Sequence, residues 1–202
     1  MATGYEQADF WAKKAKKEGY PARSVYKLQE LDEKFKLLKP GMRVLDIGAA
    51  PGSWSMWVAR RIGPSGFLAA VDLQPLRIAL DPSASFFVQG DIYDQAVRDA
   101  IRERGPYNLV LSDAAPATSG NHGLDTDRSE ALVEAVLDYA DDMLAPGGSV
   151  AAKLFMGGGQ KALLERLRGA YGSARAFKPK TCRPQSFETY ILGLVRKPAQ
   201  AG

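Results

Sequence analysis

The sequence is poor in the two residue types that build many metal and disulfide sites. Its 202 residues contain one cysteine, Cys182, and one histidine, His122. A lone cysteine cannot form an internal disulfide, and this pair cannot assemble a Cys/His zinc site, which takes four ligands. The counts exclude a disulfide-stapled fold and a structural zinc module. We therefore expect no metal site and a chemistry that rests on other side chains.

Long apolar runs are also absent. No segment approaches the roughly 20 apolar residues that cross a bilayer, and residues 1–20 lack the apolar core of a signal peptide. We expect a cytoplasmic protein without membrane association. The composition, 46% apolar and 25% charged without repeats, is that of a globular chain. Its length is typical of one domain, which we expect to span residues 1–202.

Charge is distributed unevenly along the chain, although the net charge is only +4. Residues 13–27 carry a net charge of +5 and residues 161–202 a net charge of +7, whereas residues 40–160 carry −6. Two basic ends around an acidic middle are typical of a protein that binds a polyanion such as nucleic acid. Solvated lysine-rich helices explain the same pattern equally well.

Apolar patterning predicts alternating strands and helices. Strands are expected at residues 43–47, 66–71, 85–89, 108–111, 149–153 and 189–195. Helices are expected at residues 9–18, 23–35, 53–61, 92–104, 128–144 and 160–171. This alternation indicates βαβ units in an open, doubly wound α/β sheet, in which ligands bind beyond the carboxyl ends of the strands.

The first predicted strand runs into a turn of small residues, 48–53, that precedes a helix. The turn departs from the G-x-G-x-x-G motif of dinucleotide-binding proteins, and Pro51 lacks the N–H that a pyrophosphate would need. A ligand without phosphates, such as S-adenosylmethionine, therefore fits the turn better. Asp72 ends the next strand, where a carboxylate can accept hydrogen bonds from ribose hydroxyls, and Asp91 ends the one after. Taken singly, Asp91 as a helix N-cap and Asp46 as a structural residue are the simpler interpretations.

Three segments in this order resemble the FtsJ (RrmJ) family of S-adenosylmethionine-dependent RNA 2′-O-ribose methyltransferases: residues 46–54, 112–116 and 146–149. The resemblance covers about residues 9–195. It implies a Rossmann-like class I methyltransferase fold with a mostly parallel seven-stranded sheet, in which a helical extension (1–39) precedes an α/β core (40–196). It also implies S-adenosylmethionine as cofactor, bound by Gly52, Trp54, Asp72, Asp91 and Asp113. Ser53 departs from the family, which commonly has glycine there, and we expect little effect.

The resemblance further implies a catalytic tetrad of Lys27, Asp113, Lys153 and Glu188. Lys153 would lie nearest the ribose 2′-oxygen, and Asp113 would hold its ammonium group. The positive charge of Lys27 would favour the neutral amine of Lys153, whereas the carboxylates of Asp113 and Glu188 would favour its ammonium form. Lys153 can therefore be either a general base or a group that orients the hydroxyl. Two neighbours are expected outside the chemistry: Tyr190 in the core and His122 in an exposed loop.

Basic side chains near both ends are predicted to contact RNA phosphates, which gives salt-dependent affinity with little sequence preference. They are Lys13, Lys14, Lys16, Lys17, Arg23, Lys178, Lys180 and Arg183. Tyr26, among them, is expected to pack rather than to stack on bases. Cys182 replaces a serine that is frequent in the family, so a hydroxyl contact is expected to be lost.

The compact form of the chain resembles the bacterial members that act on ribosomal RNA. The expected substrate is therefore a uridine in the A loop of 23S ribosomal RNA, within the large ribosomal subunit, methylated by a monomeric enzyme. A tRNA anticodon-loop methyltransferase is the alternative. Two other classes remain open: a non-catalytic RNA-binding factor, which would not bind S-adenosylmethionine, and a methyltransferase for small molecules or proteins, which would lack salt-dependent RNA affinity.

Overall fold

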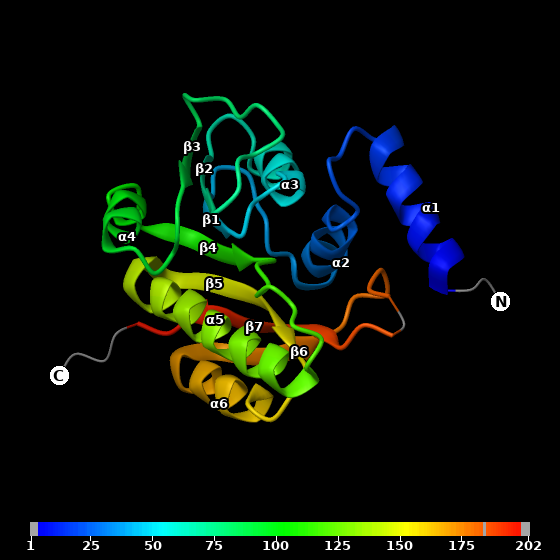
Figure 1. Ribbon diagram of the computed structural model, residues 1–202. Coiled ribbons are helices and arrows are strands. Elements are labelled where there is room, and N and C mark those ends of the chain that lie inside the picture. Colours follow the sequence, from blue (N-terminus) through cyan, green and yellow to red (C-terminus); the bar gives the residue numbers. More distant parts are fainter. Residues whose placement is uncertain (1–3, 184, 199–202) are drawn as a thin grey trace.

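The computed structural model describes residues 4–183 and 185–198 (Figure 1). Over these residues, seven strands form one sheet in the order β3-β2-β1-β4-β5-β7-β6. The strands are β1 (Arg43–Ile47), β2 (Phe67–Asp72), β3 (Ser85–Gln89), β4 (Tyr107–Ser112), β5 (Leu144–Phe155), β6 (Tyr171–Phe177) and β7 (Glu188–Arg196). The helices are α1 (Gly4–Lys17), α2 (Val25–Phe35), α3 (Ser53–Ile62), α4 (Gln95–Arg102), α5 (His122–Met143) and α6 (Gln160–Ala170).

The sheet is parallel from β3 to β5 and antiparallel at β7. This confirms the doubly wound, mostly parallel α/β class. The strand pattern in the sequence had identified every strand except β6. That strand lies at an edge of the sheet, and its sequence, YGSARAF, has only two buried residues, Tyr171 and Ala174. A half-exposed edge strand with glycine and serine gives almost no apolar alternation.

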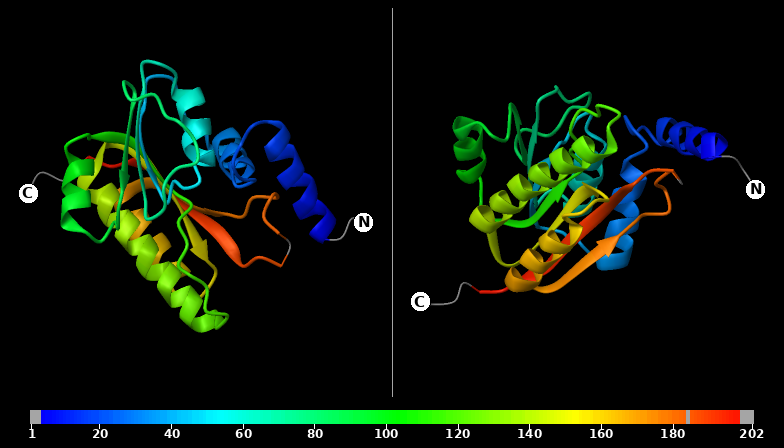
Figure 2. Two further views of the ribbon diagram at one scale, coloured as in Figure 1. Left: turned by 45° about the horizontal axis from the view of Figure 1, so that its top comes forward. Right: turned by 60° about the horizontal axis from the view of Figure 1, so that its bottom comes forward.

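Helices cover both faces of the sheet (Figure 2). One face packs on α4, α5 and α6 through a large apolar cluster that includes Val133, Val136 and Leu163. The other face packs on α2 and α3 through Leu28 and Val58, among others. Helix α1 lies outside these layers, beside α2, and a small cluster around residues 15–26 attaches it.

Four helix starts differ from the expected ones, and for two of them, α4 and α5, a capping side chain explains the difference. Helix α4 begins at Gln95 rather than at residue 92, because the Asp94 carboxylate accepts a hydrogen bond from the Ala96 N–H. Asp91 is therefore not the N-cap. Helix α5 begins at residue 122 rather than 128, with Asn121 as its cap, so His122 lies in the first turn of a helix and not in a loop.

The topology brings several chain segments to one edge of the sheet. Strand order reverses between β1 and β4, and the carboxyl ends of both strands meet there. Because β7 runs antiparallel to β5, its first residue, Glu188, pairs with the last residue of β5, Phe155. The start of β7 therefore joins the edge at which ligands bind in doubly wound sheets. None of the helices in the described part of the chain is long and apolar enough to cross a bilayer.

Beneath this edge, β1 carries a fully buried carboxylic acid, Asp46. Its Oδ2 accepts a hydrogen bond of 2.6 Å from the Ser55 hydroxyl, whereas its Oδ1 has no partner among the described residues. Burial raises the pKa of Asp46 to about 7. The hydrogen bond from Ser55 lowers this pKa, and the negative charges of Asp113 and Asp72 raise it further. Asp46 is thus a structural residue of the strand, as its simpler interpretation had it.

The raised pKa of Asp46 predicts a pH-dependent stability. The native state keeps this proton up to about pH 7, whereas the unfolded chain releases it near 3.8. The free energy of unfolding should therefore fall as the pH rises from about 4 to about 7, by at most about 4 kcal/mol. Asp46→Asn cannot ionise and should flatten this fall in urea unfolding, whereas Asp127→Asn on the surface should keep it. Equal slopes for wild type and Asp46→Asn would contradict the assignment.

Candidate active site

A cavity of about 580 Å³ opens at the carboxyl ends of β1, β2 and β4. Three of the predicted cofactor residues line it, namely Asp72, Asp91 and Asp113. Its rim also carries the exposed apolar side chains of Leu73 and Tyr93. Arg128 of α5 supplies a positive charge to the lining. The sequence did not single out these last three residues, because only the fold brings them to the strand ends.

Two of the aspartates in the cavity also organise its walls. Asp72 Oδ2 accepts a 2.8 Å hydrogen bond from the Ala50 N–H, which ties β2 to the turn after β1, and Oδ1 accepts one from Gln74. Asp91 Oδ1 accepts a hydrogen bond from the Tyr93 N–H. An ionised carboxylate has about four acceptor sites, so each side chain keeps free capacity for a ligand.

The turn after β1 needs glycine for steric reasons. Gly48 has a φ of +76°, and a Cβ added there would lie 2.6 Å from the Cα of Ala114. Gly52, at the start of α3, has a φ of +114°, and its missing Cβ would meet Ile78. Gly48 lines the cavity, whereas Gly52 does not. The contact of Gly52 with the cofactor therefore stays a prediction.

Trp54 is also absent from the lining of the large cavity. Its ring is buried and stacks on Tyr190 at 5.8 Å, and its Nε1 donates to the Ser24 carbonyl. It reaches only a small adjoining hollow of about 40 Å³, which Asp113 also lines. Trp54 therefore packs between α3, β7 and the residue before α2 and borders this hollow next to Asp113, and its contact with the cofactor stays a prediction.

The four predicted tetrad residues come together from four separate elements. Lys27 lies on α2, Asp113 directly follows β4, Lys153 lies on β5 and Glu188 begins β7. They form two ion pairs, with Lys153 Nζ 3.1 Å from Asp113 Oδ1 and Lys27 Nζ 2.8 Å from Glu188 Oε2. Lys153 Nζ also donates to the main-chain carbonyl of Asp113. Lys27 is only 8% exposed, so this lysine is not a surface residue.

Charge pairing keeps these buried groups ionised. Burial alone would raise the pKa of Asp113, but the positive charges of Lys153 and Lys27 hold it below its usual value. Glu188 behaves in the same way, with Lys27 offsetting the effect of burial on its pKa. Burial lowers the pKa of Lys27, and the charges of Asp113 and Glu188 overcome it, so the pKa of Lys27 is raised. All three groups are therefore charged near neutral pH.

Comparison with known proteins agrees with this geometry. Residues 20–196 match the model of the FtsJ-like methyltransferase family. The chain belongs to this family. It is 50% identical over 190 residues to ribosomal RNA large subunit methyltransferase E of Treponema denticola, covering 94% of this chain and 96% of that one. It is 46% identical over 195 residues to the protein of the same name from Sorangium cellulosum, covering 96% and 91%.

Solved structures confirm the Rossmann-like methyltransferase fold. A Plasmodium falciparum chain, provisionally named a ribosomal RNA methyltransferase, superposes with a TM-score of 0.76 at 26% identity. The match covers 89% of this FtsJ-like chain and all of the other. Human methyltransferase-like protein 13 in complex with SAH has a TM-score of 0.56 at 14% identity, over 80% of this chain and 76% of that one, which shows the fold alone.

Sequence reasoning missed one member of the site in this FtsJ-like chain. Tyr190 lies in the core, as expected, and is fully buried. Its hydroxyl nevertheless donates a hydrogen bond of 2.6 Å to Asp113 Oδ1, the oxygen that also faces Lys153. The β5–β7 register pairs Lys153 with Tyr190, which explains why both reach Asp113. No local sequence signal distinguishes this tyrosine from an ordinary core residue.

Both departures from the family pattern have partners here. The Ser53 hydroxyl, which is buried, accepts a hydrogen bond of 2.7 Å from the Ala22 N–H and so ties α3 to the segment before α2. The buried Cys182 thiol interacts with the Glu188 carboxylate and helps to lower its pKa. Burial, followed by the negative charge of Glu188, raises the pKa of Cys182 to about 12, so it stays a thiol. Cys182 thus interacts with the tetrad through Glu188, and the expected loss of a hydroxyl contact stays a prediction.

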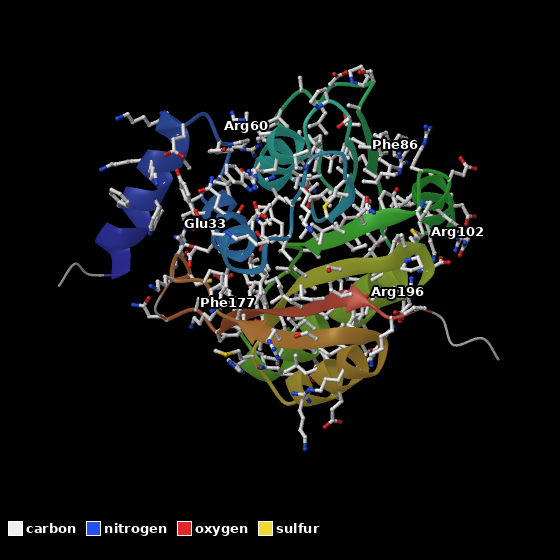
Figure 3. The ribbon with its side chains drawn as sticks, turned by 180° about the vertical axis from the view of Figure 1, so that it is seen from behind. Glu33, Arg60, Phe86, Arg102, Phe177 and Arg196 are labelled. Carbon is white, nitrogen blue, oxygen red and sulfur yellow. The ribbon has the colours of Figure 1, made fainter. Side chains whose placement is uncertain are left out.

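The predicted RNA-binding residues gather on one side of the molecule. Helix α1 lies beside the β6–β7 loop, which carries Lys178, Lys180 and Arg183 (Figure 1). A groove of about 610 Å³ separates them and has both Lys14 and Lys180 in its lining. Glu33 and Phe177 line the same groove, on the side of the core that faces α1 (Figure 3).

The basic residues of this side differ in how firmly they are held. Lys13, Lys16 and Lys17 are exposed on α1. Lys14 instead lies over the rings of Trp11 and Tyr26, at 5.1 and 4.7 Å. Arg23 is half-buried and donates to the Thr181 carbonyl. Tyr26 packs, as expected, and its hydroxyl donates to Glu18.

The carboxylate of Glu30 fixes the β6–β7 loop against α2. It accepts hydrogen bonds of 2.8 Å from the main-chain N–H groups of Lys180 and Thr181. These contacts hold the loop where Cys182 can reach Glu188. The position of the Lys27–Glu188 pair therefore depends on contacts outside the tetrad.

The Tyr190 hydroxyl should matter for methyl transfer more than for folding. Tyr190→Phe keeps the buried ring and removes one donor to Asp113, and a hydrogen bond to a charged group is worth about 1.5–3 kcal/mol. We expect the single-turnover rate of methyl transfer to fall roughly 10-fold or more. Tyr107→Phe removes a similar buried hydroxyl at the opposite end of β4 and serves as the control. Equal rates for the two variants would show that Tyr190 only packs.

Proposed function

We propose that this chain transfers a methyl group from S-adenosylmethionine to a ribose 2′-hydroxyl of large-subunit ribosomal RNA, with a uridine of the 23S A loop as the target. The observation that carries the proposal is the Lys153–Asp113 ion pair, which borders the cavity through Asp113 and is backed by the Lys27–Glu188 pair. The ribosomal substrate is supported by the relatives of 50% and 46% identity, both named for the large subunit. Their names do not favour the tRNA alternative.

The cavity has the properties that S-adenosylmethionine requires. Its size lies within the range of about 300–1,000 Å³ that is typical of small-molecule sites. Carboxylates suit the ribose hydroxyls and the cationic groups of this cofactor, and Asp72 at the end of β2 is the candidate for the ribose. Leu73 and Tyr93 offer apolar surface for the adenine, beside Asp91. Pro51 in the turn lacks the N–H that a phosphate group would need.

The residues of the tetrad would position and activate the acceptor hydroxyl. When bound, S-adenosylmethionine supplies the electrophilic methyl group. Lys153 has three donor positions as an ammonium, and two are used on Asp113, which leaves one for the ribose oxygen. Holding the hydroxyl in a near-attack position is worth up to roughly 7–11 kcal/mol, and a positioned base adds about 3–5 kcal/mol. The double contact with Asp113 favours the orienting role of Lys153.

The remaining parts of the proposal concern RNA and organisation. Residues 1–39 would form a basic extension of the catalytic core at 40–196, in one monomeric unit whose ends, 1–3 and 199–202, lie outside the described residues. The extension and the β6–β7 loop would contact phosphates on the side of the molecule where Lys16, Lys17, Lys180 and Arg183 are exposed. Because the substrate would be ribosomal, we also propose a cytoplasmic enzyme.

The test of this function is the transfer of labelled methyl groups to separate pools of RNA. The pools are tRNA, free ribosomal RNA and large ribosomal subunits that lack native modification, with mapping of 2′-O-methylated riboses. We expect label at one A-loop ribose. Label in tRNA alone would keep the reaction and overturn the substrate, and cofactor binding without label in any pool would overturn the RNA methyltransferase proposal.

Two substitutions should separate chemistry from cofactor binding. Lys153→Ala should reduce transfer by about 10²–10⁴-fold or more and leave the Kd for S-adenosylmethionine nearly unchanged, because Lys153 acts on the acceptor. Asp72→Ala should raise that Kd first. Lys161→Ala, exposed on α6, is the control for charge removal. A parallel loss of binding and transfer in Lys153→Ala would make Lys153 a structural residue instead.

A further inference from the structure

An aromatic cluster lies next to Glu188 of the tetrad, and none of its members lines the cofactor cavity. The Phe187 ring lies 4.9 Å from that of Phe155 and 4.6 Å from the His122 imidazole, measured between centroids. Phe187 directly precedes Glu188, and Phe155 pairs with Glu188 in the β5–β7 register. Because side chains alternate along a strand, Phe155 shares the face of Lys153, two residues earlier.

The cluster is exposed to solvent and has an exposed apolar neighbour, Met156. His122 is exposed, and Phe155 and Phe187 are half-buried. Met156, whose N–H donates to the Phe187 carbonyl, is 38% exposed. Large exposed apolar side chains that gather at one place mark binding surfaces. Leu73 and Tyr93, which are even more exposed, line the cofactor cavity.

The position of this surface determines what can occupy it. The cavity takes up the ends of β1, β2 and β4, so an acceptor ribose that reaches Lys153 has to approach from the ends of β5 and β7. Those ends, with the start of α5, lie together at one side of the sheet (Figure 1). A base is one glycosidic bond from its ribose and therefore has to lie beside the tetrad. Phosphates of the same strand would meet Lys178, Lys180 and Arg183, in the loop that leads to Phe187.

From this placement we infer that Phe187 and His122 form a stacking platform for the base of the acceptor nucleotide. The inference rests on the proposed function and deepens it, since it requires an unpaired acceptor whose base is turned out of any helix. Proteins recognise single-stranded RNA by stacking such bases on aromatic side chains, including histidine. The platform would fix the base, and Lys153 would receive the 2′-hydroxyl of the same nucleotide.

The first test is kinetic and uses large ribosomal subunits that lack native modification. Base stacking on one aromatic side chain corresponds to roughly 5- to 150-fold in affinity, so Phe187→Ala should raise the KM for subunits by that factor. The Kd for S-adenosylmethionine should not change. His122→Ala should act in the same direction, and His122→Phe, which keeps a ring, should restore the wild-type KM. Phe86→Ala, on the edge strand β3 far from Phe177 and α1 in Figure 3, is the control.

The second test does not need methyl transfer. His122 is the only histidine of the chain, so its imidazole gives a single set of proton resonances. A hexanucleotide of uridine should shift these resonances upfield through the ring current of a stacked base, and Phe187→Ala should reduce the shift. Absence of any shift in the wild type, or the same shift in Phe187→Ala, would overturn the platform.

The two tests separate the platform from the proposed function. A wild-type protein that shifts the His122 resonances but methylates no RNA would contradict the function and keep the RNA surface. Normal methylation by Phe187→Ala would keep the function and overturn the platform. If Phe187→Ala weakens transfer to subunits but leaves the hexanucleotide shift intact, the patch contacts ribosomal protein, and the inference is wrong.

Discussion

Four ionisable side chains lie in the interior at one edge of the sheet, and the need to pair them constrains the surrounding structure. Removing one partner of a buried ion pair typically costs about 3–5 kcal/mol, since the remaining charge lacks compensation. Lys153 and Lys27 each have a carboxylate within hydrogen-bonding distance. Positive and negative charges can therefore both be kept where little water reaches them. Their electrostatic interactions with a substrate are stronger there than in water.

This pairing requires a particular topology. An all-parallel sheet would bring only carboxyl ends of strands to the edge, whereas the antiparallel β7 brings its first residue, Glu188, there as well. Helix α2 has to lie over the same edge so that Lys27 can reach Glu188. Its position is secured by the Ser53–Ala22 hydrogen bond on one side and by the contacts of Glu30 with the β6–β7 loop on the other. The N-terminal helices are thus part of the site.

The sequence predicted the site better than its surroundings. Strand ends could be found from apolar runs, and Asp72, Asp91 and Asp113 all line the cavity because they lie at the end of a strand or within two residues after it. The membership of Lys27 and Glu188 in one tetrad came from family resemblance, since the two residues are 161 positions apart and only the fold brings them together. The Tyr190–Asp113 hydrogen bond and the rim residues Leu73, Tyr93 and Arg128 depend on side-chain direction, which patterning does not reveal. Gly52 and Trp54 do not line the main cavity, and their contact with the cofactor stays a prediction from family resemblance.

A crystal structure with S-adenosylhomocysteine bound would test the central claim most directly. We predict the ribose hydroxyls on the Asp72 carboxylate, the adenine between Leu73 and Tyr93, and the sulfur facing the Lys153–Asp113 pair, with both ion pairs of the tetrad intact. The ligand bound away from the ends of β1, β2 and β4, or Lys153 turned out to solvent with Asp113 unpaired, would contradict the account.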